Sequence, residues 1–368
     1  MPCPSKSPLF TDFCDPKKRE VFVPLKWETQ IHRRVSRPDT IKPGIFHFKA
    51  YRVAPADLRG VILIFDPSAH TPEFKKPEQF EYKQIKSLYD RFCEQTRSCE
   101  AQPVTILLWQ RLYRHQIAII NDMMFIMLQT ENGPLFLLPL AEDMQTAVNI
   151  IISYCRKKGI KPRFLASQGG LFDRFSKCGI SGYTLSSFRD DYEYIYNTSD
   201  LINLSGKKYH SKRNHITAFN KKYNWSYESL SEDLLPEIFS LADKWSEHSI
   251  SIGEDPQSIN SENSAIKRVL PRYKELGIMG GAIKVDGEAV AFSFASAINS
   301  TTADVHVEKA LPDFRDAYPI INQQLAIHEL SRFKYLNRED DMGLEGLRKA
   351  KLSYHPAVLL EKYFIDFC

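Results

Sequence analysis

The sequence predicts a mixed α+β fold of two similar lobes, each a mixed sheet flanked by helices, preceded by an N-terminal extension. Alternating or continuous apolar runs bounded by turn residues indicate strands, and amphipathic stretches indicate helices. The order of these elements in the first half of the chain recurs in the second. With 368 residues, the chain has room for two or three domains. We therefore expect an accessory extension at 1–74, a first lobe at 75–198, and a second lobe at 199–368 that carries the active site.

Composition excludes several classes of protein. Hydrophobic residues make up 43% of the chain and charged residues 26%, which is typical of a globular rather than a disordered protein. The net charge of +4 is too small to indicate a nucleic-acid or lipid partner for the chain as a whole. Seven scattered cysteines without a CxxC pair predict reduced thiols and no metal site. The sequence contains neither a signal-peptide pattern nor a long apolar stretch. We therefore expect a cytoplasmic protein with no transmembrane segment, and peripheral contact with a membrane stays an open alternative.

The elements of the extension and first lobe follow from local patterns. The extension is rich in proline and charge and contains apolar runs typical of strands at 45–53 and 60–65. The first lobe is predicted as a helix at 82–93, an alternating strand-like run at 106–120, a hairpin within 123–140 that turns at 131–133, a helix at 144–158 ended by Gly159, a strand at 164–166, and a helix at 171–177.

The second lobe repeats this order. Helices are predicted at 235–248, 265–276, 317–333 and 345–352, three strands within 280–310 with turns at 286–287 and 299–302, and further strands at 334–337 and 359–367.

The segment 204–223 is the most informative for function, because it contains six lysines and arginines and no acid. At helical spacing, Tyr209, Ile216, Phe219 and Tyr223 form one apolar stripe and leave most cations on other faces. A solvated surface helix normally interleaves acids with its lysines. We therefore interpret the segment as a helix that contacts a polyanion, with a solvated helix as the alternative. The candidate phosphate-binding residues are Lys207, Lys208, His210, Lys212, Arg213 and Asn214, joined by Lys349 and Lys351.

A second candidate is the strand 304–308, where Asp304, His306 and Glu308 alternate with two valines. Period two places the polar side chains on one face and the valines toward the core. A histidine and a carboxylate on a shared face could supply the general base that deprotonates an amine. The alternative is a solvated face of the sheet.

A third candidate is the charged segment 335–356, which follows a short strand. Open α/β sheets place their sites at such strand ends, whereas the alternative is a surface loop with compensating ion pairs. Lys349 and Tyr354 are candidate oxyanion donors, and Tyr354 joins His306 and Glu308 as a catalytic candidate. The acceptor-site candidates are Asn322, Asn337, Arg338, Glu339 and Asp340.

Together these segments resemble the phosphatidylglycerol lysyltransferase C-terminal domain family, in a soluble, stand-alone form. The resemblance covers about residue 80 to the C-terminus and is carried by DYEYIY (191–196), DLINLSGKKYHSKRNHI (200–216), GGAIKVDGEAVAF (280–292), HVEKA (306–310), INQQLA (321–326) and the segment 335–356. It implies a tandem GNAT-like fold, similar to Fem-type transferases that move an amino acid from aminoacyl-tRNA to an amine or hydroxyl. Since this chain has no membrane-spanning stretch, a phosphatidylglycerol acceptor is in doubt, and the acceptor stays open.

The resemblance implies an acyltransferase with aminoacyl-tRNA as donor and no permanently bound cofactor. Two alternatives remain: a CoA-dependent GNAT N-acyltransferase and a non-catalytic polyanion-binding protein on the same fold. CoA-dependent relatives cradle pyrophosphate with a glycine-rich loop at the start of a helix. Residues 314–319 at the equivalent position contain no glycine and an added acid, which favours the tRNA donor.

Overall fold

The structure, a computed structural model, describes residues 71–314 and 316–367, together with the backbone of three short strands, β1 (Val21–Phe22), β2 (Phe48–Arg52) and β3 (Val61–Phe65). Most of the predicted extension therefore lies outside the described residues. No helix in the described ranges is long and apolar enough to cross a bilayer. Their four cysteines, Cys93, Cys99, Cys155 and Cys178, are free, as predicted.

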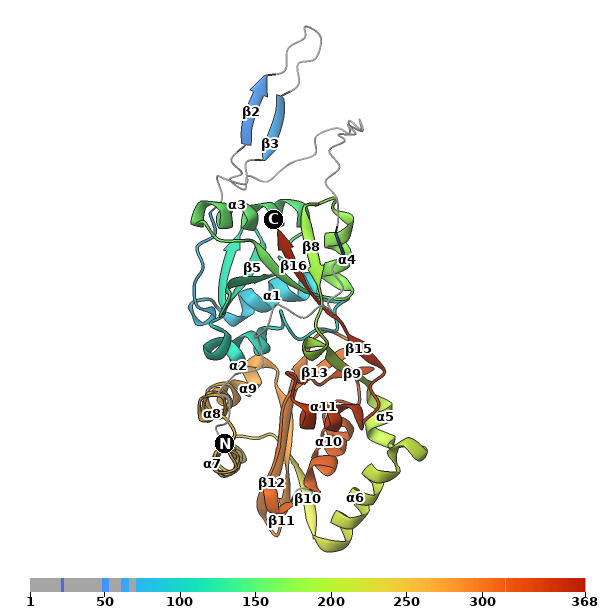
Figure 1. Ribbon diagram of the computed structural model, residues 1–368. Helices are drawn as coiled ribbons and strands as arrows, with labels where there is room; N and C mark the ends of the chain where they lie inside the picture. Colours follow the sequence, from blue (N-terminus) through green and yellow to red (C-terminus); the bar gives the residue numbers. More distant parts are fainter. Residues whose placement is uncertain (1–20, 23–47, 53–60, 66–70, 315, 368) are drawn as a thin grey trace, which may run out of the picture.

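Two seven-stranded sheets form the cores of two lobes (Figure 1). The first lobe contains α1 (Tyr82–Phe92), α2 (Pro103–Tyr113), β4 (Gln116–Ile120), β5 (Met123–Thr130), β6 (Gly133–Leu137), α3 (Met144–Lys158), β7 (Arg163–Ser167), α4 (Gly170–Lys177) and β8 (Tyr183–Ser186). The second begins with β9 (Glu193–Asn197), α5 (Thr198–Asn203), η4 (Lys207–Tyr209), α6 (His210–Lys222), β10 (Trp225–Ser229), α7 (Leu235–Ser251), α8 (Pro256–Val269) and α9 (Tyr273–Leu276). It continues with β11 (Met279–Val285), β12 (Glu288–Ala297), β13 (Thr302–Ala310), α10 (Ala317–His328), β14 (Tyr335–Asn337), α11 (Glu345–Leu352), β15 (Val358–Leu360) and β16 (Lys362–Phe367).

The two lobes share one plan. Each sheet contains an antiparallel meander and a parallel pair joined through a helix, β6–α3–β7 in the first lobe and β13–α10–β14 in the second. The sheet orders are β1-β8-β16-β7-β6-β5-β4 and β10-β11-β12-β13-β14-β9-β15. This arrangement confirms the predicted α+β, tandem GNAT-like fold.

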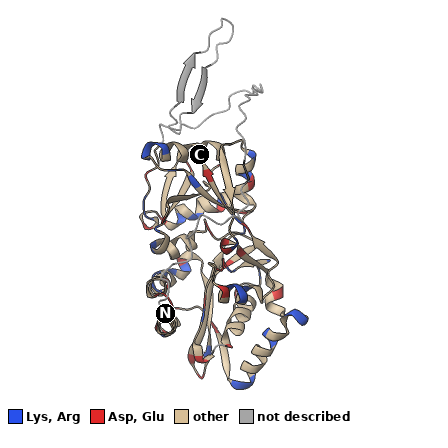
Figure 2. Ribbon diagram, viewed as in Figure 1, with Lys and Arg blue, Asp and Glu red and all other residues tan. Residues whose placement is uncertain are grey.

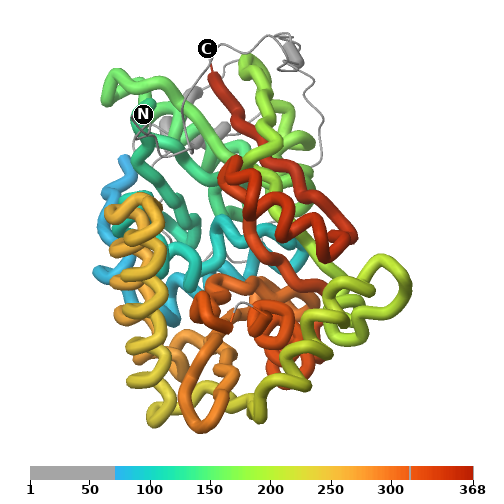
Figure 3. The backbone as a smooth tube through the Cα atoms, turned by 60° about the horizontal axis from the view of Figure 1, so that its bottom comes forward, coloured from blue at the N-terminus to red at the C-terminus, as the bar shows by residue number. Residues whose placement is uncertain are grey.

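The lobes exchange one strand each. β9 follows the first lobe in sequence but pairs with β14 and β15 of the second sheet. β16, at the end of the chain, returns to the first sheet and lies between β7 and β8 (Figure 3). The predicted single strand at 359–367 is therefore two strands in different sheets, and strand pairing crosses the predicted boundary at residue 198.

One predicted strand is largely a helix. Within the run 106–120, residues up to Tyr113 belong to α2, and only β4 is extended. Pro103 occupies the first turn, and the Gln102 side chain caps the helix by accepting a hydrogen bond from the Thr105 amide at 2.8 Å. Because α2 is buried on nearly all sides, its residues show no amphipathic stripe that would have identified it.

Helices cover both faces of the second sheet. α7 and α8 pack against Phe292, Phe294 and Val307 on one face, which also contacts α2 of the first lobe. α10 packs against the other face, together with η4 and α6, which contribute Tyr209 and Phe219. Side chains near the end of β14 therefore contact α2, α7 and α8 if they lie on one face of the sheet, and α6 and α10 if they lie on the other.

Candidate active site

The parallel pair in the second sheet leaves an opening between β13 and β14. The two strands pair from Thr302 with Tyr335 to Asp304 with Asn337, and pairing stops there although β13 continues to Ala310. Arg338 and Glu339 follow β14 directly and lie beside the unpaired part of β13. The candidate site is built around this opening.

A β-bulge in β13 determines which side chains face each side. Val307 pairs with Phe294 and Val305 pairs with Ala295, so His306 is an extra residue without a partner on β12. The bulge interrupts the alternation of side chains. Glu308 therefore lies on the α10 face with Val305, whereas His306 and Val307 lie on the α2, α7 and α8 face. The prediction that His306 and Glu308 share a face was wrong for this reason.

Glu308 is held in a charged cluster on the α10 face. One of its carboxylate oxygens accepts a hydrogen bond from Arg338 Nη2 at 3.0 Å, and the other accepts one from Asn322 Nδ2 at 3.0 Å. The exposed fractions of the Arg338 and Glu308 side chains are 12% and 11%. The Arg338 guanidinium carbon lies 5.0 Å from the centre of the Tyr354 ring. Of the predicted residues, Glu308, Asn322, Arg338 and Tyr354 therefore come together.

Lys212 joins this cluster from the basic helix α6. Its Nζ lies 3.9 Å from the centre of the Tyr354 ring. Burial and the charge of Arg338 lower the pKa of Lys212 to about 8, against the opposing effect of Glu308. Burial raises the pKa of Tyr354, so its hydroxyl stays protonated and able to donate. We refer to Lys212, Glu308, Asn322, Arg338 and Tyr354 as the α10-face cluster.

Two polar atoms of this cluster remain available. Asn322 Oδ1 and Arg338 Nη1 are buried without a hydrogen-bond partner among the described residues. Such atoms in a native protein usually contact a ligand, water or ion. Asn322 Oδ1 can accept a hydrogen bond from an amine or hydroxyl, and Arg338 Nη1 can donate one to a carbonyl oxygen.

His306 is enclosed on the opposite face. Its side chain has no solvent exposure, its Nε2 lies 2.7 Å from Ser296 Oγ, and its Nδ1 lies 3.2 Å from Asp304 Oδ2. Glu339 Oε1 lies 3.6 Å from the same Nδ1. The structure thus separates His306 from the α10-face cluster, and its predicted partnership with Glu308 is not formed.

Several predicted ligand-binding residues instead hold the loop after β14. Asn337 is fully buried and donates to the Arg97 carbonyl at 2.8 Å. Lys351, predicted to bind phosphate, is buried and donates to the Arg338 carbonyl at 2.6 Å. Asp340 accepts from Lys362 Nζ at 3.0 Å. These three side chains are used for contacts within the protein, because buried backbone carbonyls and the buried ammonium group of Lys362 need hydrogen-bond partners.

Lys362 was missed by the sequence analysis and connects the lobes. It begins β16, is buried, and forms ion pairs with Glu100, Glu193 and Asp340. The Glu193 carboxylate also accepts from Ser98 Oγ at 2.7 Å and from the Cys99 amide at 3.1 Å. The sequence of β16 does not mark Lys362 as a buried residue, so only the exchange of strands reveals this role.

Much of the basic segment is exposed, and Figure 2 marks its lysines and arginines near the two ends of α6. Its exposed polar side chains include those of Lys207, Lys208, His210, Asn214, His215, Lys221 and Lys222. Arg213 is partly buried and donates to the Leu204 and Gly206 carbonyls, which fixes the turn before the helix. Lys349 is exposed on α11. The predicted apolar stripe faces inward, with Tyr209 and Phe219 buried.

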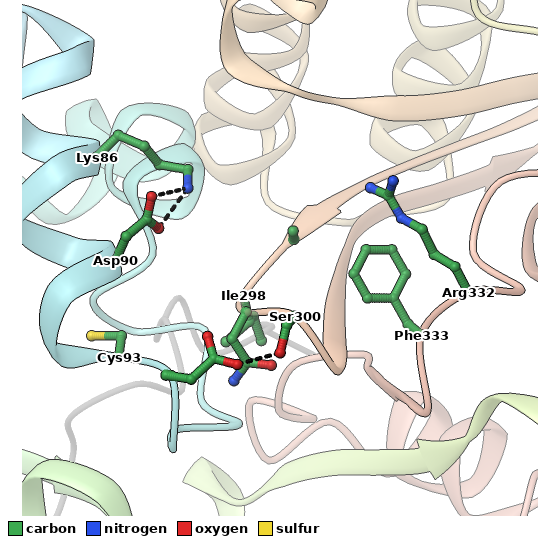
Figure 4. A pocket seen from close by; sticks show the side chains of 10 residues that line it. Lys86, Asp90, Cys93, Ile298, Ser300, Arg332 and Phe333 are labelled. Carbon is green, nitrogen blue, oxygen red and sulfur yellow. Dashed lines mark hydrogen bonds and ion pairs between the residues drawn. The ribbon is translucent and has the colours of Figure 1, made fainter.

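A separate groove lies between α1 and the β12–β13 turn (Figure 4). Its volume is about 470 Å³, and Lys86, Asp90 and Cys93 of one wall face Ser300, Arg332 and Phe333. Lys86 and Asp90 pair with each other at 2.5 Å. None of the predicted site residues lines this groove.

Comparison with known proteins places the chain in a family. The model of the family described as "Phosphatidylglycerol lysyltransferase, C-terminal" matches residues 95–366. An uncharacterised protein of Mycoplasmoides gallisepticum is 25% identical over 175 residues, which are 47% of this chain and 55% of that protein. The chain thus spans about half the length of this curated relative.

Two solved structures share the fold. A conserved protein of unknown function from Bacteroides thetaiotaomicron is 29% identical, with a TM-score of 0.73 over 81% of this chain and 100% of that chain. L-PGS from Bacillus licheniformis is 15% identical, with a TM-score of 0.53 over 78% of this chain and 92% of that chain.

Proposed function

Because the chain belongs to the phosphatidylglycerol lysyltransferase C-terminal family, we propose that it is an acyltransferase that moves an aminoacyl group from aminoacyl-tRNA to an amine or hydroxyl of an acceptor. The observation that carries this proposal is the double role of the basic segment. Its outer side chains form a surface of cations, while Lys212 on its inner side reaches Arg338 and Tyr354. One helix thus links a surface suited to a polyanionic donor with a cluster suited to acyl transfer.

The chemistry assigns a role to each member of the cluster. The acceptor nitrogen or oxygen forms a bond to the ester carbonyl carbon, and the bond from that carbon to the ribose oxygen of tRNA breaks. A base takes the acceptor proton, and the ribose oxygen gains a proton as it leaves. Glu308 or the neutral form of Lys212 is placed to act as the base. Arg338 and the protonated Tyr354 are placed to stabilise the tetrahedral oxyanion.

The start of α10 supports tRNA over CoA. Asp316 occupies the N-cap position, and its Oδ1 lies 2.8 Å from His215 Nδ1. The Asp316 side chain makes no hydrogen bond to the helix amides, but its negative charge at the terminus repels a pyrophosphate. Pro319, near the start of the helix, also contributes no backbone N–H to an anion.

The proposal is tested by following a labelled amino acid from charged tRNA into the lipid and aqueous small-molecule fractions of a cell extract. We expect the protein to increase label in one fraction, which also distinguishes a lipid from a soluble acceptor. Replacing Lys207 and Lys208 with alanine should weaken tRNA binding about tenfold or more at low salt, because two phosphate contacts are lost. Arg156 and Lys158, exposed at the end of α3, provide a control that removes the same charge. Equal binding by both double variants would contradict the role of the basic segment.

A further inference from the structure

Three potential metal ligands meet on the α2 face of the opening, and His306 lies beside two of them. Cys99 lies in the loop before α2, Asp304 and His306 lie on β13, and Glu339 follows β14. One ligand atom from each of Cys99, Asp304 and Glu339 lies within 4.8 Å of the others. His306 Nδ1 lies 3.2 Å from Asp304 and 3.6 Å from Glu339. The sequence spacing predicted no metal site, because these residues are far apart along the chain.

The cluster lacks a cation. Among the described residues, neither Asp304 nor Glu339 forms an ion pair with a lysine or arginine, and His306 is the ionisable partner of both. In the same region, by contrast, Glu193 and Asp340 pair with Lys362. Burying carboxylates without an ion-pair partner is unfavourable, and a bound metal ion would balance their charge.

Three of these residues have buried polar atoms without a partner among the described residues. Asp304 Oδ1, His306 Nδ1 and Glu339 Oε1 are buried and form no hydrogen bond with the described residues. The Asp304 and His306 side chains have no solvent exposure. Glu339 also adopts a left-handed backbone conformation, with φ of 55°. A non-glycine residue in this conformation is strained, and such strain is concentrated at functional sites.

We propose that Cys99, Asp304, His306 and Glu339 bind one zinc ion. A thiolate, an imidazole and two carboxylate oxygens form a donor set that zinc accepts in tetrahedral geometry, and the thiolate disfavours magnesium and calcium. His306 Nε2 lies 2.7 Å from Ser296 Oγ. In the tautomer that carries its proton on Nε2, this nitrogen donates to Ser296 Oγ and the Nδ1 lone pair is free for the metal. Thr105 Oγ1 similarly donates to Asp304 Oδ2 at 3.1 Å. Zinc–ligand bonds of about 2.0–2.3 Å require the cluster to contract slightly.

The metal ion would join three parts of the chain behind the α10-face cluster. It would fix the loop that contains Cys99 to β13 and to Glu339. Arg338, the neighbour of Glu339, extends to the opposite face and contacts Glu308. The zinc site thus positions the Arg338–Glu308 pair without contacting the substrate, and it stands independently of the proposed donor and acceptor.

The metal content of the full-length protein, purified without chelator after growth with zinc, tests the proposal directly. We expect about one zinc per chain by inductively coupled plasma mass spectrometry. Cys99→Ser should lower the zinc content at least fivefold, whereas Cys155→Ser, in the core of the first lobe, should leave it unchanged. Cobalt-substituted protein should show thiolate-to-cobalt absorption that is absent from the Cys99→Ser variant.

Glu339→Gln keeps the test decisive if Cys99→Ser does not fold, because the Glu339 side chain is 23% exposed and its replacement is nearly isosteric. This variant should also lose zinc. The proposal would be overturned if the protein were purified without metal and then bound neither zinc nor cobalt. A zinc content unaffected by both variants would overturn it as well, because the metal would then be bound elsewhere.

Discussion

His306 and Glu308 are separated by one residue on β13, yet their side chains lie on opposite faces of the sheet. The bulge at His306 shifts the pairing with β12 and reverses the alternation. Glu308 contacts Asn322 of α10, whereas His306 contacts Ser296 and Asp304 on the α2 face. The two residues that the sequence places in one general-base pair therefore belong to different clusters.

Substitutions of the two residues should consequently have different effects. Glu308→Gln should lower transfer by about 10²-fold if the carboxylate is the base, with little change in stability because the glutamine can still accept from Asn322. His306→Ala should mainly lower the free energy of unfolding, by about 1–3 kcal/mol, because it leaves buried partners unsatisfied. Labelled aminoacyl transfer and urea denaturation measure the two effects. If both variants lost activity equally and neither lost stability, the result would support the predicted general-base pair of His306 and Glu308.

Local signals in the sequence predicted much of the fold. The helix at 144–158 matches α3, and Gly159 ends it with a φ of 65°, because the amphipathic pattern and the terminal glycine are local. By contrast, α2 is buried on nearly all sides, and β9 and β16 are exchanged between the sheets. Both features depend on packing between the lobes, which leaves no local pattern in the sequence.

The candidate site was predicted only in part. The motif residues Glu308, Arg338 and Tyr354 come together because the charged segment after β14 returns to β13. Tertiary packing decides the other positions. Lys351 and Asn337 donate to backbone carbonyls inside the protein, and Lys212 faces inward, and no local pattern in the sequence indicates this. The bulge at His306 has no glycine or proline to mark it. Hence the region of the site was predictable, but not the face of each residue.

Lys362 should contribute strongly to stability, because its side chain is 3% exposed and forms ion pairs with Glu100, Glu193 and Asp340. Lys362→Met leaves these carboxylates without their cation, and we expect a loss of about 3–5 kcal/mol in the free energy of unfolding. Lys274, exposed and paired with Glu232, provides the control. Lys274→Met should leave the midpoint of denaturation nearly unchanged. Similar midpoints for the two variants would contradict the role of Lys362 between the lobes.

CoA should bind weakly or not at all, because Asp316 and Pro319 replace the glycine-rich start of the corresponding helix in CoA-dependent relatives. Isothermal titration calorimetry with CoA and with tRNA in one buffer compares the two donors. A submicromolar dissociation constant for CoA, equivalent to about −8 kcal/mol or stronger, would favour a CoA-dependent N-acyltransferase instead.

Lys212 should titrate near neutrality, with a pKa of about 8 that follows from burial and from the charge of Arg338. Trace labelling with acetic anhydride, followed by peptide mass spectrometry across a range of pH, measures the fraction of neutral amine at this position. Arg338→Gln should raise the midpoint because a repelling cation is removed, whereas Glu308→Gln should lower it because an attracting carboxylate is removed. If Lys212 is the base, the pH profile of transfer should rise through the same midpoint and shift in the same directions. Midpoints that do not move in opposite directions would show that Lys212 does not sense the Glu308–Arg338 pair, and would leave Glu308 as the sole candidate base.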